Sequence, residues 1–158
     1  MSLSCWSAQG AHSSAGEKHE AGMSKISQYA TTGYFIGGDR SVKSAKLKDI
    51  RRGPQKGGVE RIVFDLQSAD QDKAPYFQVN ISPNENRLLL SIWADVTYEF
   101  DADKIKKAFT KSGKVKFVNV IPRVEDGIAT IELTLKSSSV KVEAFHLAHP
   151  ARIILDLL

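Results

Sequence analysis

The residues with the clearest chemical pattern are an arginine and an aspartate that recur in the same order in two short segments. Residues 61–66 are Arg-Ile-Val-Phe-Asp-Leu, and residues 152–157 are Arg-Ile-Ile-Leu-Asp-Leu. Residues 87–92 are a degraded third copy, in which Ser91 stands in place of the aspartate. An arginine beside each aspartate keeps the carboxylate ionised, so the pair is better suited to binding a ligand than to acting as a general acid.

Successive side chains of an extended strand point to opposite faces. If each copy is a strand, Ile62, Phe64 and Leu66 enter a core, while the arginine, the middle aliphatic residue and the aspartate form an outer row. The repeated order predicts a reused ligand surface. The alternative is a row that only keeps one face hydrated and fixes the register. The predicted ligand-binding residues are Arg61, Val63, Asp65, Arg152, Ile154 and Asp156.

The order of the charges also predicts how the two copies pair. If they lie antiparallel with partner numbers that add up to 217, Arg61 faces Asp156 and Asp65 faces Arg152. Opposite charges directly across two strands stabilise the pairing by about 0.2–1 kcal/mol, and by little where they are exposed. If the copies lie on separate sheets instead, each row is a ligand surface of its own.

Residue types that carry catalysis or bind metals are otherwise sparse. His146 and His149 are three residues apart, on opposite faces of a strand, and residues 26–158 hold no other histidine or cysteine to complete a zinc site. No serine has the glycine-flanked setting of a nucleophile elbow. Gly57-Gly58 precedes a strand rather than a helix, unlike a phosphate loop. We therefore expect a protein that is not an enzyme, with no catalytic residue, no metal and no cofactor.

The positive charge is concentrated in two segments. The net charge is +4, but residues 40–61 hold eight lysines and arginines against two acids, and residues 101–125 hold seven against three. Such asymmetry marks either a face for polyanions or a solvated face. Proteins that bind single-stranded nucleic acid interleave basic residues with stacking aromatics, whereas Phe109 and Phe117 fit core positions here. We expect no nucleic-acid partner.

The chain has the length and composition of one globular domain with additional sequence at its start. It has 158 residues, 42% of them hydrophobic, and no apolar run near the roughly 20 residues of a membrane helix. Residues 1–25 are expected to be a disordered leader, tag or linker, and residues 26–44 an N-terminal arm. Cys5 is either the lipid-bearing residue of an exported lipoprotein, which gives the only expected membrane contact, or an incidental thiol.

Residues 45–158 alternate between short apolar–polar segments and turn residues, which predicts an all-β fold. We expect a sandwich of two small sheets with about eight short strands. One helix is predicted near 101–111, because Asp101 is a suitable N-cap, Ile105 and Phe109 share an apolar face, and Gly113 ends the pattern.

Several of these segments together resemble the AMIN domain. The resemblance rests on Gly-Gly-Val-Glu-Arg-Ile-Val-Phe-Asp-Leu at 57–66, the Tyr-Phe-Gln-Val strand from Tyr76, and the closing His-Pro-Ala-Arg-Ile-Ile-Leu-Asp-Leu at 149–157. AMIN domains occur in bacterial envelope proteins, including cell-division amidases and pilus secretins. The resemblance implies a compact β-sandwich over residues 45–158 whose outer motifs, Arg61, Val63, Asp65 and Arg152, Ile154, Asp156, localise a protein to the envelope, through peptidoglycan.

The sequence therefore predicts a non-catalytic, exported module of the periplasm or cell envelope that binds peptidoglycan. The alternative is a protein–protein adaptor of a type IV pilus or secretion assembly, which uses an exposed strand edge or the same rows. The lysine-rich helix and the long segment before Ser44 depart from the AMIN pattern. These departures leave open which envelope machinery the chain serves.

Overall fold

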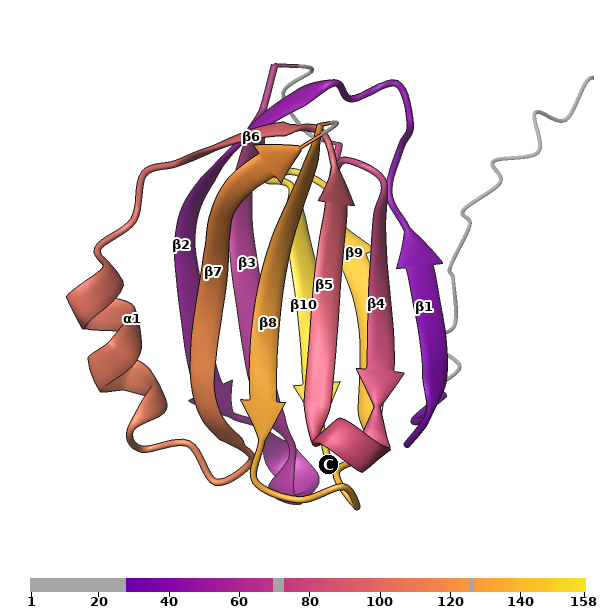
Figure 1. The fold of residues 1–158 in the computed structure, drawn as a ribbon, viewed down its shortest axis with the longest axis vertical. Coiled ribbons are helices and arrows are strands. Elements are labelled where there is room, and N and C mark those ends of the chain that lie inside the picture. The colour runs from indigo at the N-terminus through magenta and orange to yellow at the C-terminus, as the bar shows by residue number, and fades with distance from the viewer. Residues whose placement is uncertain (1–27, 70–72, 126) are drawn as a thin grey trace, which may run out of the picture.

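The computed structural model describes residues 28–69, 73–125 and 127–158 and is an all-β sandwich with one α-helix. Two five-stranded sheets stack face to face, with sheet B in front of sheet A in the view of Figure 1. Sheet A has the order β6 (Asp95–Tyr98), β2 (Ser44–Pro54), β3 (Glu60–Ser68), β10 (Arg152–Leu157), β9 (Val142–Leu147). Sheet B has the order β1 (Gly33–Gly37), β4 (Phe77–Ser82), β5 (Arg87–Trp93), β8 (Ile128–Leu135), β7 (Val115–Glu125).

The core lies between the sheets and is built by the alternation predicted from the sequence. In β3, Ile62, Phe64 and Leu66 are buried, while the residues between them are partly exposed. In β8 every second residue from Ala129 to Leu135 is buried. The degraded third copy of the repeat is β5, which lies in the opposite sheet and points Leu88, Leu90 and Ile92 into the same core.

The predicted pairing of the two full copies is confirmed. Strands β3 and β10 are antiparallel neighbours in sheet A, with Arg61 opposite Asp156 and Asp65 opposite Arg152. Because a slip of one residue would move every apolar side chain to the other face, the core and the charge order specify the same register. The repeat is therefore a pair of adjacent strands and not two separate surfaces.

The chain contributes more strands than the sequence predicted. The described residues contain ten strands instead of about eight. Part of the predicted N-terminal arm is strand β1, which pairs antiparallel with β4 at the edge of sheet B, with Phe35 packed against the core. The predicted leader at 1–25, including Cys5, lies outside the described residues.

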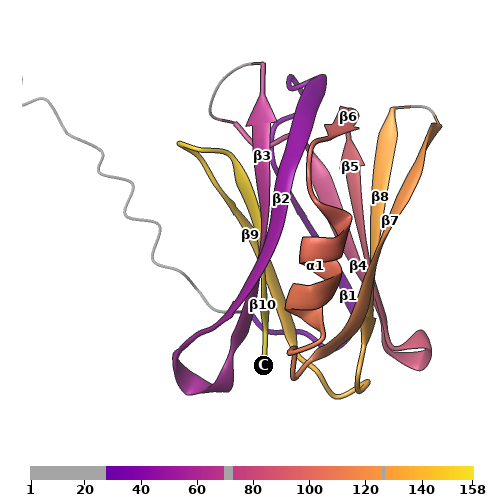
Figure 2. The same ribbon diagram turned by 90° about the vertical axis from the view of Figure 1, so that its left-hand side faces the viewer.

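One helix closes a side of the sandwich, as predicted. Helix α1 (Ala102–Phe109) lies beside β2 and β7 in both ribbon views (Figures 1 and 2). Its Ile105 and Phe109 are buried. The Asp101 carboxylate caps it by accepting hydrogen bonds from the backbone N–H groups of Asp103 and Lys104, at 3.0 and 3.1 Å. The helix ends at Phe109, before the predicted 111. Two short 3-10 helices, η1 (Lys56–Gly58) and η2 (Pro83–Glu85), connect β2 to β3 and β4 to β5.

Candidate functional site

Most of the predicted site residues lie around one shallow hollow on the outer face of sheet A. The hollow has a volume of about 260 Å³, and strands β2, β3, β9 and β10 supply its walls. Arginines dominate its rim, and aliphatic side chains form the rest of its surface. We call it the arginine hollow; its main lining residues are Arg51, Arg52, Arg61, Val63, Leu147, Arg152 and Ile154.

Arg61 and the buried Asp156 form a bidentate ion pair. Its Nε and Nη2 donate to the two carboxylate oxygens, both at 2.7 Å, and the side chains are 32% and 2% exposed. The guanidinium also lies 5.5 Å from the centre of the Phe145 ring, at cation–π distance. The hydrogen-bonded Asp156 carboxylate raises the pKa of Arg61, against the opposing effect of partial burial, so the arginine is fixed in its charged form.

The expectation of a fully solvent-exposed second row is wrong. Ile154 and Asp156 are both buried, while Arg152 is partly exposed. The physical reason is the side chains of the neighbouring strands, since Ile154 lies in register between Val63 of β3 and Phe145 of β9. Asp156 lies beneath the guanidinium of Arg61. These two residues therefore support the hollow and offer a ligand little surface.

Asp65 is shared by two arginines. Arg51 binds it with two nitrogens, Nη2 to Oδ1 at 2.8 Å and Nε to Oδ2. Arg152 approaches the same carboxylate only to 3.7 Å, too far for a hydrogen bond, and its buried Nε has no acceptor in the described part of the chain. Two guanidinium groups thus surround one carboxylate, which leaves positive charge and N–H donors for a second anion.

Arg51 and Arg52 are site residues that the repeat did not indicate. Their presence follows from the pairing of β2 with β3, which places Arg51 opposite Val63. Arg52 reaches Glu60 at 3.4 Å, and the Glu60 carboxylate also accepts a hydrogen bond from Ser112. The alternating pattern of residues 45–52 already marked this strand as half polar. Only the neighbouring strand, however, identifies which side of it borders the hollow.

A lysine pair lies elsewhere on the surface of sheet A. Lys46 and Lys48 of β2 both bind the carboxylate of Glu99, which follows β6. The hydrogen bonds from Lys46 and Lys48 lower the pKa of Glu99 from 4.5 to about 2. Both lysines are hydrogen-bonded to the shared carboxylate, whereas around Asp65 only Arg51 is.

Phe117 does not occupy the predicted core position. It is half exposed and lines a groove between α1 and β7, together with the edge-to-face pair of Tyr98 and Phe100. Phe109, in contrast, is buried as predicted. The bulge between Val115 and Phe117 in the pairing of β7 with β8 interrupts simple alternation, so an alternation rule misassigns Phe117.

The remaining candidates for chemistry do not gather into a site. His146 packs edge-on against Phe77, with ring centres 6.0 Å apart. Residues 28–69, 73–125 and 127–158 contain no group of three potential metal ligands. Within the same ranges, no helix has the length and apolar character needed to cross a bilayer.

Searches against models of protein families, curated proteins and solved structures return no match to this chain.

Proposed function

We propose that this protein is a non-catalytic binding module of the bacterial cell envelope that holds peptidoglycan through carboxylates of the polymer. The observation that carries the proposal is the shared Asp65: two arginines surround it, and Arg152 lacks a hydrogen-bonded carboxylate in the described residues. A ligand carboxylate can accept hydrogen bonds from such guanidinium groups in the bidentate geometry that arginine favours.

The geometry of the hollow suits weak, repeated binding to a polymer. Its guanidinium groups are partly exposed, and exposed ion pairs contribute only about 0–1 kcal/mol each. A single contact would therefore be short-lived. Peptidoglycan repeats its carboxylates along strands and peptides, so many weak contacts with several copies of the protein yield a strong overall association.

The proposed envelope location rests on the resemblance to AMIN domains, and the sandwich fold agrees with the fold that this resemblance implies. Under this proposal the chain acts after export, in the periplasm, and the arginine hollow takes the place of the exposed rows expected from the sequence. The binding residues are then Arg51 and Arg152, with Val63 as apolar contact, while Arg61, Ile154 and Asp156 shape the hollow.

Sedimentation with purified peptidoglycan sacculi tests the proposal. Wild-type protein should cosediment, and Arg51→Gln/Arg152→Gln should sediment at least about tenfold less, because losses of about 0–1 kcal/mol at each contact add up over many contacts along the polymer. The control Arg87→Gln/Lys107→Gln removes the same charge from sheet B and α1. An equal loss in both variants would show that net charge, and not the hollow, drives binding.

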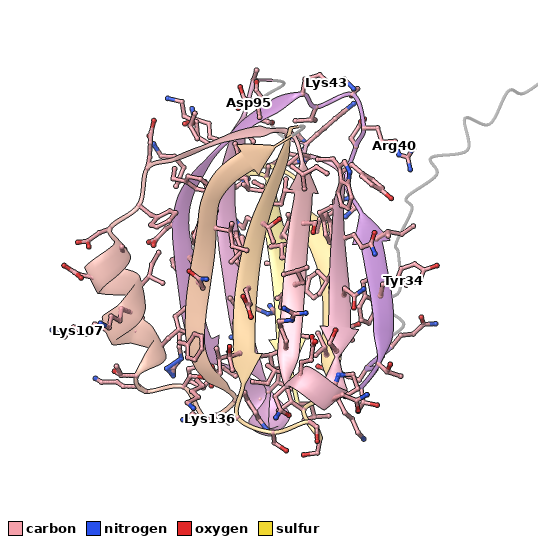
Figure 3. The ribbon with its side chains drawn as sticks, viewed as in Figure 1. Tyr34, Arg40, Lys43, Asp95, Lys107 and Lys136 are labelled. Carbon is pink, nitrogen blue, oxygen red and sulfur yellow. The ribbon has the colours of Figure 1, made fainter. Side chains whose placement is uncertain are left out.

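An adaptor function remains the second candidate because β1 presents apolar side chains at a sheet edge. Tyr34 and Ile36 are 67% and 58% exposed, and Figure 3 shows Tyr34 projecting away from the sandwich. Edge strands with apolar side chains favour pairing with another chain. Absence of sedimentation by the wild type, together with a complex lost in Tyr34→Ser/Ile36→Ser, would favour the adaptor.

A further inference from the structure

A second cluster of cationic and aromatic side chains lies outside the arginine hollow. Arg40, Lys43, Tyr76 and Trp93 surround a depression of about 360 Å³, which is within the size range of small-ligand sites. Figure 3 shows Arg40 and Lys43 at the same end of the sandwich. We call this cluster the Trp93 site. None of its residues lines the arginine hollow.

Close backbone contact fixes Arg40 over an aromatic ring. Gly38 has a φ of +80°, and a Cβ at this position would lie 2.0 Å from the carbonyl oxygen of Pro75, so only glycine fits. This approach allows two backbone hydrogen bonds that involve Asp39, one to the oxygen of Ala74 at 2.9 Å and one from the N–H of Tyr76 at 3.0 Å. The Arg40 guanidinium then lies 4.5 Å from the centre of the Tyr76 ring.

The other two residues are tied to the same framework. The N–H of Trp93 donates to the carbonyl oxygen of Tyr76 at 2.9 Å, and the two rings lie 5.3 Å apart, tilted by 58°. The N–H of Asp95 donates to the carbonyl oxygen of Lys43, also at 2.9 Å. Backbone hydrogen bonds thus hold the main chain of three separate segments in place before any ligand arrives, which reduces the entropy cost of binding.

Arg40 is available to an anion. Arg51, Arg52, Arg61, Arg87 and Arg152 each lie within 4.0 Å of a carboxylate, but Arg40 forms no ion pair with any described residue, and neither does Lys43. The guanidinium of Arg40 lies over the Tyr76 ring, and this contact orients the guanidinium plane. The N–H groups of Arg40 lie at the edge of the guanidinium plane and remain able to bind a carboxylate in bidentate geometry.

Trp93 provides an apolar platform next to these cations. It is 36% exposed, whereas one face of the Tyr76 ring is covered by Arg40. The C–H bonds on one face of a pyranose ring are apolar and pack against a flat indole, while the sugar hydroxyl groups stay in the ring plane. One open aromatic surface beside two cations therefore matches a single sugar ring that carries a negative charge.

From this arrangement we propose that the Trp93 site binds a carboxylated saccharide, with the sugar ring on Trp93 and the carboxylate held by Arg40 and Lys43. A separate hollow of about 300 Å³ begins at Ser44, the residue after Lys43, and presents hydroxyl and amide groups of Ser44, Gln67 and Thr97, which suit sugar hydroxyls. It also contains Asp95, whose charge disfavours a polyphosphate chain, and Lys46, which is bound to Glu99. These features favour a saccharide over single-stranded nucleic acid, which needs several stacking surfaces along a basic groove.

The proposal rests on the proposed envelope function for the identity of its ligand, a glycan fragment of peptidoglycan. The probe is the soluble peptide-free disaccharide of peptidoglycan, whose lactyl group carries a free carboxylate on the sugar ring, compared with its methyl ester. In a Trp6→Phe background Trp93 is the only tryptophan, so its fluorescence reports binding directly. We expect a saturable change with the free acid and roughly tenfold weaker binding of the ester.

Variants separate this site from the arginine hollow. Arg40→Gln should weaken fragment binding about tenfold, and Lys107→Gln, a control on α1, should leave it unchanged. Isothermal titration then compares Trp93→Ala with Arg51→Gln/Arg152→Gln. The inference is supported if Trp93→Ala loses fragment binding and Arg51→Gln/Arg152→Gln keeps it. This holds even if the arginine variant still sediments with sacculi, a result that would contradict the proposed function of the hollow.

Three results would overturn the inference. Equal binding of acid and ester would remove the role of the carboxylate. Fragment binding that survives Trp93→Ala would place the saccharide elsewhere, whether or not sacculi bind the hollow. Tighter saturable binding of oligothymidylate than of the fragment, lost in the same variant, would identify the site as a nucleic-acid site.

Discussion

Replacement of Arg61 by methionine should destabilise the protein much more than the same replacement of Arg51. Arg61→Met would deprive the buried Asp156 carboxylate of the guanidinium bound to it at 2.7 Å. Removal of one partner of a buried ion pair costs about 3–5 kcal/mol. Because the Arg61 side chain is 32% exposed, we expect the lower end, about 3 kcal/mol. The Arg51 side chain is 52% exposed, so its loss should cost about 0–1 kcal/mol.

Urea denaturation followed by circular dichroism measures both costs. For a slope of about 1–3 kcal/mol per molar urea, a loss of 3 kcal/mol lowers the midpoint by roughly 1–3 M. A double-mutant cycle with Asp156→Asn separates the pair interaction from other effects, and the double variant should cost less than the sum of the two single variants. A cost below about 1 kcal/mol for Arg61→Met, or additive costs in the cycle, would refute the assignment of this pair as a structural element.

Three further measurements test other parts of the structure. Phe64→Ala should cost about 3–5 kcal/mol in urea denaturation, whereas Val63→Ala on the outer face of the same strand should cost less than half as much; equal costs would contradict the alternation. Asp101→Ala should remove the N-cap of the helix and lower the free energy of unfolding by about 1 kcal/mol. An unchanged unfolding midpoint would rule out the capping role of Asp101. The lowered pKa of Glu99 means that its contribution to stability is present above about pH 4.5 and is lost as the pH falls toward about 2. Glu99→Gln should therefore flatten the dependence of the unfolding free energy on pH across that window, and an unchanged slope would contradict the contact.

The pairing of β3 with β10 could be predicted because two independent patterns in the sequence specify the same alignment. The apolar residues Ile62 and Phe64 determine which face is inward, and the complementary order of arginine and aspartate determines the partner residue. The N-cap of α1 was predictable for a similar reason, since the cap is a local interaction between Asp101 and the next three residues.

The burial of Asp156 could not be predicted, because it depends on which strand lies on the other side of β10. The sequence of β10 is the same kind of Arg–aliphatic–Asp row as that of β3, yet its neighbour β9 places Phe145 beside Ile154 and the buried Glu143 beside Asp156. Likewise, nothing local connects Arg40 with Tyr76. They meet because Gly38 lets the backbone approach Pro75, a contact between segments that are far apart in the chain. Long-range contacts of this kind are absent from any short sequence window.

The position of β10 beside β3 has a consequence for how the chain acquires its structure. Arg61 and Asp156 are 95 positions apart, while β4 and β5 are joined by the single turn of η2, and β8 begins three positions after the last residue of β7. Closing a long loop is slower than forming a hairpin. We expect the two hairpins of sheet B to assemble early and the C-terminal strand to enter sheet A last, so that the final kinetic step also completes the arginine hollow.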